Sequence, residues 1–333
     1  MRFSRYQPRR PGAGLFVHLL MPLLLSLLAV PPAMAKAKIF TLTDPRGDDH
    51  GDGNLIYPLN EELNPGDLDI LSLSASADSG GTWFAVTFAK PVKQPGAETV
   101  DDLGTTLRSL ARFGFHTINL DIYIDTDRVP GSGGVAMLPG RLAEIDRNSA
   151  WEKAVLLTPR PPEARGELKR ILMRNLNEET KDDSSMTDRE AAALKAQIPG
   201  DVDDRIYFPN QIRVRGNSIS FFVPAAFLGG PAKDTWSYVV ASSGANVLQA
   251  FDLNRVLGRQ SEKEEALMIL PISPGRWQDR FGGGRDNAAI QPPLVDVIVP
   301  KAGRPQESVF QDFDARSKRP VILPGVVPAE EKK

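Results

Sequence analysis

The chain has 333 residues, of which 41% are hydrophobic and 25% charged, and its formal net charge is −2 at pH 7. This balance is typical of a globular protein and argues against nucleic acid as a partner, because nucleic-acid-binding surfaces are strongly basic. The chain has no cysteine. Disulfides, thiol catalysis, cysteine-ligated zinc and covalently attached c-type haem are therefore excluded.

The first 35 residues have the pattern of an export signal. Four arginines precede an apolar run from Leu15 to Val30, and Ala33-Met34-Ala35 then matches the small-x-small rule for cleavage. A retained membrane anchor is the alternative, but Pro22 interrupts the run, so we expect cleavage before Lys36. The mature chain then carries 36 basic and 42 acidic residues, with no later segment that could span a membrane. We predict a periplasmic or secreted protein.

The mature chain opens on an acidic, glycine-rich segment. Asp44, Asp48, Asp49 and Asp52 lie within nine residues and alternate with three glycines, a composition that forms neither a helix nor an apolar strand. Calcium takes six to eight oxygen ligands in flexible geometry, and glycines let short side chains converge on one point. The segment is not an EF-hand, because Leu59 occupies the twelfth position. It is interpreted as a calcium site; a solvated turn capped by aspartates is the alternative.

Further candidate calcium ligands follow in the chain. Asp69 comes shortly after the acidic segment, and Asp125 and Asp127 end the clearest strand, residues 118–125. Aliphatic residues alternate along this strand, so we expect its other side chains, Asp121 and Asp125 included, to face outward. Asp44, Asp48 and Asp49 are predicted to lie together, and Asp125 or Asp127 is expected to join them.

Alternating or apolar runs separated by glycine and proline predict mainly strands. Residues 69–76 and 82–90 are expected to form one hairpin, and residues 212–215 and 218–223 form another around Gly216-Asn217. Further strands are expected at residues 151–157, 236–240 and 294–299. Residues 163–198 have helical spacing with a capping box at Thr187 and are interpreted as a charged helical insertion that ends at Pro199-Gly200. We predict an antiparallel β-sandwich over residues 36–313 and a disordered tail over residues 314–333.

Five ordered motifs carry a family resemblance. They are Asp44-Pro45-x-Gly47-Asp48-Asp49-x-Gly51-x-Gly53 with Tyr57-Pro58; Asp67-Leu68-Asp69; Asp121-Ile122-Tyr123-Ile124-Asp125-Thr126-Asp127; Leu138-Pro139-Gly140-Arg141 with Trp151; and Phe281-Gly282-Gly283-Gly284 before Leu294-Val295-Asp296. Together they resemble the glucodextranase C-terminal, DOMON-like domain family, a β-sandwich related in fold to family-9 carbohydrate-binding modules. The resemblance implies a module associated with polysaccharides, often attached to secreted α-glucan-degrading enzymes or to surface-layer proteins.

The leading hypothesis is an exported, non-catalytic carbohydrate-binding module that is stabilised by calcium. Its ligand would be a polysaccharide or oligosaccharide such as an α-glucan, and a partner glycoside hydrolase would act in trans. Candidate residues for stacking on sugar rings are Tyr57, Trp83, Trp151 and Trp277, although each is also a plausible core aromatic.

Two other binding functions stay open: a structural or adhesion protein of the cell envelope rigidified by calcium, and b-type haem binding through Met137 or His116. We do not predict an enzyme, because no spacing singles out an acid and a nucleophile among the scattered carboxylates.

Overall fold

A computed structural model describes residues 37–181, 186–248, 267–285, 291–314 and 316–331, so the predicted signal peptide lies outside the described residues. Residues Lys36–Lys333 form one compact unit. Among the residues described, no helix has the length and apolar character needed to cross a bilayer.

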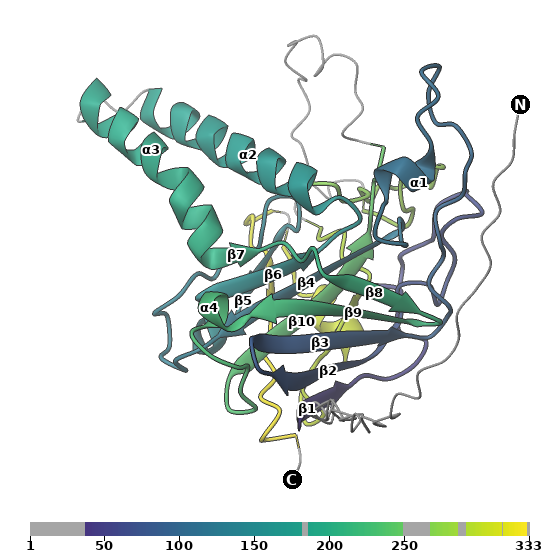
Figure 1. Cartoon of the computed structure of the whole chain (residues 1–333), viewed down its shortest axis with the longest axis horizontal. Coiled ribbons are helices and arrows are strands. Elements are labelled where there is room, and N and C mark those ends of the chain that lie inside the picture. The colour runs from purple at the N-terminus through teal and green to yellow at the C-terminus, as the bar shows by residue number, and fades with distance from the viewer. Residues whose placement is uncertain (1–36, 182–185, 249–266, 286–290, 315, 332–333) are drawn as a thin grey trace, which may run out of the picture. The chain divides into compact units, whose positions relative to one another are not determined.

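Two five-stranded sheets form the centre of this unit (Figure 1). The first sheet has the strand order β1-β2-β3-β9-β8, and all its neighbours are antiparallel. Its strands are β1 (Ala37–Thr43), β2 (Ile70–Asp78), β3 (Gly81–Phe88), β8 (Ile212–Arg215) and β9 (Ser218–Pro224). The second sheet has the order β11-β10-β4-β6-β7 and is antiparallel except for the β6–β7 pair. Its strands are β4 (Ile118–Asp125), β6 (Lys153–Leu157), β7 (Ile206–Tyr207), β10 (Ser237–Gly244) and β11 (Asp296–Val297).

The main core lies between the two sheets, as the alternating sequence pattern requires. Phe84, Val86 and Phe88 of β3 are fully buried, while the residues between them are half-buried on the outer face. The inner face of β4 meets them with Ile122 and Ile124. Both predicted hairpins, β2–β3 and β8–β9, are present. The predicted β-sandwich is therefore confirmed.

A second core covers the other face of the second sheet. It contains Tyr123 of β4 and Val239 of β10, and residues of two long helices, α2 (Pro161–Lys181) and α3 (Asp188–Arg205), pack against the same core. The short elements β5 (Ala143–Ile145), β12 (Val321–Leu323) and α6 (Gln306–Phe310) complete this layer. The outward orientation predicted for Asp121 and Asp125 is wrong, because β4 is buried along its whole length. The remaining short elements are α1 (Leu107–Leu110), η1 (Arg147–Ser149) and α4 (Ala225–Leu228).

The helical insertion is anchored in the second core. Thr187 caps α3 as expected, with its side chain accepting from the backbone of Glu190. Pro199 does not end the helix, which continues to Arg205 and buries Val202. Asp203 of α3 accepts hydrogen bonds from Arg165 and Lys169 of α2, at 2.8 and 3.1 Å. The two helices run side by side (Figure 1).

Part of the segment predicted as a disordered tail is ordered. Val321–Leu323 form β12, which pairs in parallel with β5. Val321 and Leu323 are fully buried, and Val326 makes a bridge with Tyr238 of β10. The short Val-Ile-Leu run is too brief to stand out from its proline-rich surroundings, and its order depends on a partner strand far away in the sequence.

Candidate functional site

Three aspartates from distant parts of the sequence meet where the two sheets adjoin. Asp44 follows β1, Asp48 lies in the loop after it, and Asp296 begins β11 of the other sheet. Each offers a carboxylate oxygen within 4.8 Å of those of the other two. Strand ends of both sheets therefore deliver oxygen ligands to one point.

Backbone hydrogen bonds fix this arrangement. The amide of Asp44 donates to the carbonyl of Leu71 at 3.1 Å, which ties the end of β1 to β2. Asp296 accepts from the amide of Ile70 at 2.5 Å and so joins β11 to the start of β2. Gly47 has a φ of 86°, a conformation that favours glycine and turns the chain so that its amide donates to Asp69 at 2.7 Å.

Gln306 of α6 holds the acidic loop against the second sheet. Its amide nitrogen donates to the carbonyl of Asp48 at 2.5 Å, and its oxygen accepts from the amide of Val297 at 2.6 Å. The side chain is 3% exposed, so these bonds form away from water, where they are strong. The loop carrying Asp48 is thus attached to the strand carrying Asp296.

Asp69 adds a fourth carboxylate at the edge of this group. Its charge raises the pKa of Asp44 and of Asp48, so it lies within electrostatic reach of both. One of its oxygens accepts from Gly47, and the other has no hydrogen-bond donor in the part of the chain that the structure describes. We call Asp44, Asp48, Asp69 and Asp296 the carboxylate cluster.

Buried oxygens of this cluster lack donors. Both oxygens of Asp44 and one oxygen each of Asp48, Asp69 and Asp296 are inaccessible to water and have no donor at normal hydrogen-bond geometry among the described residues. Only weaker contacts with the Val299 backbone and the Asp296 side chain act on Asp44. Within the same part of the chain, no ion pair joins any of the four to a lysine, arginine or histidine. Burying a charge without a partner is costly, so the arrangement calls for a cation or for protons.

The raised pKa values of the cluster reflect the same unfavourable burial of negative charge. Burial, together with the charges of Asp48 and Asp69, raises the pKa of Asp44 to about 8. Burial and the neighbouring carboxylates raise the pKa of Asp296 well above its usual value, and those of Asp48 and Asp69 rise chiefly through burial. Carboxylates that resist ionisation when alone are suited to a divalent cation, which supplies the missing positive charge.

The two other predicted ligands of the acidic segment point elsewhere. Asp49 accepts hydrogen bonds from the Tyr57 hydroxyl and from the amide of Gly66, the latter at 2.6 Å. Asp52 accepts from the amide of Asn54 at 3.0 Å and lies 3.8 Å from Arg285. Asp52 thus caps a nearby amide, as the alternative turn interpretation predicts, but neither carboxylate is solvated as that interpretation requires.

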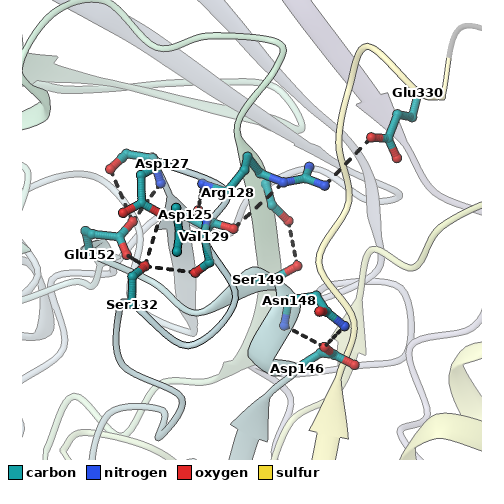
Figure 2. A network of polar contacts seen from close by, with 12 residues as sticks. Asp125, Asp127, Arg128, Val129, Ser132, Asp146, Asn148, Ser149, Glu152 and Glu330 are labelled. Atoms are coloured by element: carbon teal, nitrogen blue, oxygen red, sulfur yellow. Dashed lines mark hydrogen bonds and ion pairs between the residues drawn. The ribbon is translucent and has the colours of Figure 1, made fainter.

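Asp125 and Asp127 do not join the carboxylate cluster but form a second group with Glu152 (Figure 2). Along β10, Asp125 lies opposite Ser237 and Asp296 opposite Ser242. Five residues of strand separate the two positions by roughly 17 Å, which is too far for a shared ion.

The second acidic group is largely satisfied by its own loop. Asp125 accepts from the amide of Arg128 at 2.6 Å, and Asp127 from the amide of Val129 at 2.8 Å. Glu152 accepts from the amide of Thr126 at 2.7 Å. The guanidinium of Arg128 also lies 3.9 Å from Asp125, so this group already has a positive charge beside it. Its geometry explains a tight turn after β4 without an ion.

An open cleft of about 590 Å³ adjoins the carboxylate cluster. Asp69 and Gly47 belong to its wall and also contact each other, so the cluster and the cleft share one border. Tyr57, one of the residues predicted to bind sugar, lines the cleft, but its ring is buried and packs edge-on against Phe281. The volume is within the range of pockets that bind small molecules.

The other three aromatic candidates lie apart from one another. Trp277 is 64% exposed and follows Arg276, which lines the cleft. Trp83 is on the outer face of the first sheet, where Phe222 and the guanidinium of Arg213 pack against its ring. Trp151 is buried in the second core and meets Tyr123 edge-on. The four residues predicted to stack on sugars therefore do not form one surface.

The two residues considered as haem ligands have other contacts. His116 is buried, and its Nε2 atom lies 3.0 Å from Glu62. Met137 packs in the second core.

Sequence reasoning missed two residues of the site. Asp296 was read as part of an apolar strand, and Gln306 carried no motif. A charged residue between Val295 and Val297, in a strand buried on both faces, is the signal that singles out Asp296. Gln306 becomes recognisable only through its contacts.

Comparisons with known proteins give one result. A family model described as the C-terminal, SLH-like binding module of glucodextranase matches residues 39–325. The matched range includes the carboxylate cluster, the residues that line the cleft, and β12. No curated protein matches the chain significantly.

Proposed function

Because this chain belongs to the family of C-terminal, SLH-like binding modules of glucodextranase, we propose that it is an exported, non-catalytic carbohydrate-binding module whose fold is stabilised by calcium. The family describes a binding module, which supports a function in binding and not in catalysis. The predicted export signal supports this function, because an exported module would meet polysaccharides and millimolar calcium.

The observation that carries the calcium proposal is the set of buried carboxylate oxygens without donors. Calcium prefers oxygen ligands, and this cluster offers side chains from both sheets. An ion there would offset the repulsion between Asp44, Asp48 and Asp296 and would join the end of β1 to β11. Because Asp69 also lines the cleft, the ion would hold one wall of the ligand site in place.

Calcium content and thermal unfolding test the metal. We expect the purified mature chain to retain about one equivalent of calcium after dialysis and to unfold at a lower temperature in a chelator. Asp296→Asn should abolish both effects, whereas Asp188→Asn, which removes an exposed carboxylate on α3, should leave them unchanged. Identical melting curves with calcium and with chelator would refute a structural ion.

Retention on insoluble glycans tests the binding function. The mature chain should be retained on at least one of a panel containing α-glucans, cellulose and peptidoglycan. A chain that passes through every matrix would contradict the proposal. Retention on peptidoglycan alone would instead favour the alternative function in envelope adhesion. An absorbance spectrum without a Soret band would dispose of haem binding.

A further inference from the structure

The cleft beside the carboxylate cluster presents an uneven set of charges. Its wall includes three basic side chains, Arg46, Lys90 and Arg276, and all three are exposed. They come from three separate segments: the acidic loop, the chain after β3, and the loop before Trp277. The fold thus collects positive charges from distant positions around one opening.

These three cations lack acidic partners. Among the described residues, none of them forms an ion pair, whereas the nearby Lys93 pairs with Asp67 at 3.1 Å. The guanidinium of Arg46 donates to the carbonyl of Ala89 at 3.3 Å, and its charge acts on Asp69 without a direct ion pair between them. Asp49 and Asp69 line the same cleft, but among the described residues neither forms an ion pair with these cations.

The two carboxylates of the cleft wall, Asp49 and Asp69, accept hydrogen bonds from the protein itself. Asp49 accepts from Tyr57 and Gly66, and Asp69 accepts from Gly47 and belongs to the carboxylate cluster. The acids therefore support the wall from within while the cations remain available to a ligand.

Gly66 leaves room for the side chain of Lys90 at the wall of the cleft. It has a φ of 91°, and a Cβ atom there would lie only 3.0 Å from Cε of Lys90. The side chain of Lys90 thus lies across the glycine backbone. A side chain at position 66 would displace it.

We propose that this cleft binds an acidic sugar unit, whose carboxylate or phosphate group is held by Arg46, Lys90 and Arg276. The inference rests on the proposed carbohydrate-binding function and specifies its ligand. Arginine offers a planar pair of donors that fits such groups, and hydrogen bonds between charged groups are the strong ones. Trp277, which follows Arg276 and is 64% exposed, provides a ring for the neighbouring sugar unit.

The test is calorimetric titration of the mature chain, in calcium, with pairs of oligosaccharides that differ only in charge. Uronic-acid oligosaccharides are compared with their carboxyl-reduced counterparts, and phosphorylated with dephosphorylated malto-oligosaccharides, so that the two kinds of acidic group are distinguished. At least one acidic member should bind tenfold or more tightly than its neutral counterpart, and its affinity should fall as salt is added.

Variants locate the binding. Arg46→Gln, Lys90→Gln and Arg276→Gln should each weaken the acidic ligand by about tenfold and leave any neutral binding unchanged. Lys195→Gln, which removes the same charge from α3 outside the cleft, should have no effect. Equal melting temperatures of the variants exclude unfolding as the cause.

The outcomes separate the two proposals. Glycan binding without a preference for the acidic member of any pair, or acidic binding that none of the three cleft variants weakens, overturns the acidic-sugar inference but leaves the carbohydrate-binding function standing. Failure of every glycan, in solution and on insoluble matrices, overturns both.

Discussion

The buried ion pair between Arg141 and Asp121 holds the loop before β5 against the central strand β4. Arg141 is completely buried and donates to both oxygens of Asp121, at 2.6 and 3.0 Å. It also donates to the carbonyls of Pro139 and Leu267, at 3.1 Å each. This accounts for the Leu138-Pro139-Gly140-Arg141 motif, because the arginine closes its own loop onto the strand.

We expect Arg141→Ala to destabilise the protein by about 3–5 kcal/mol, because it leaves the carboxylate of Asp121 buried without its charge partner. The double variant Asp121→Leu/Arg141→Leu should be more stable than Arg141→Ala, since no charge is then left in the core. Urea unfolding of the single and double variants measures both effects. Equal stability of wild type and Arg141→Ala would contradict the inferred role of this pair.

Single residues also show where prediction from sequence succeeds and fails. The sequence predicts that Asp44, Asp48 and Asp49 lie together and adds Asp69 as a further ligand. The fold keeps Asp44, Asp48 and Asp69 close, whereas Asp49 accepts from Tyr57 and Gly66 instead. Asp296 was missed because its proximity to Asp44 depends on how β11 of one sheet meets the start of β2 in the other. Asp125 does not join the cluster because it lies opposite Ser237, at one end of β10, whereas Asp296 lies opposite Ser242 near the other end. Nothing in the local sequence of Asp125 shows this.

Among the secondary-structure elements, α2 is held by its N-terminal half. Leu168 is completely buried in the second core, whereas Leu194 on α3 is 39% exposed. Leu168→Ala should therefore cost about 2–5 kcal/mol, and Leu194→Ala no more than about 0.5 kcal/mol. Denaturant unfolding of the two variants compares the same substitution in both environments. Equal losses would contradict the assignment of α2 to the second core.

Strand β12 gives a sharper comparison because its neighbouring residues differ so much in burial. Leu323 is completely buried, and Ile322 beside it is 49% exposed. We expect Leu323→Ala to destabilise the protein by about 2–5 kcal/mol and Ile322→Ala by much less. Protease susceptibility of the C-terminal segment, followed by mass spectrometry, reports on the same element. If Leu323→Ala unfolds at the same urea concentration as wild type, β12 is not part of the folded core.

Elements with a strong internal pattern were predictable, whereas those that depend on a distant partner were not. The β2–β3 and β8–β9 hairpins follow from alternation and from their turns. The second core could not be foreseen, because α2, β12 and α6 come from separate parts of the chain to cover one face of β4. That cover also explains why the polar side chains of β4 are buried, although alternation alone placed them outside.

At the scale of the whole molecule, the carboxylate cluster links the stability of the sandwich to pH. Its members have raised pKa values, and that of Asp44 reaches about 8, compared with about 3.9 in an unfolded chain. The folded state without metal therefore binds protons more tightly than the unfolded state. Stability from this source is complete below about pH 4 and is lost as the pH rises through about 8.

We therefore expect the metal-free protein to become less stable from pH 5 to pH 8, and calcium to remove most of this loss because it replaces the protons. Stabilisation by calcium should be larger at pH 8 than at pH 5, and about 2.7 kcal/mol where free calcium is 100 times its dissociation constant. Urea unfolding at pH 5, 6.5 and 8, with calcium or with chelator, measures these quantities.

Asp296→Asn separates this linkage from a general effect of pH. Removing one of the repelling carboxylates should make the metal-free protein more stable at pH 8 than the metal-free wild type, while calcium should no longer stabilise it. Asn retains an oxygen that can accept from the amide of Ile70, so the strand contact is preserved. A variant that is weaker at every pH and still stabilised by calcium would show that Asp296 supports the strands and does not bind the ion.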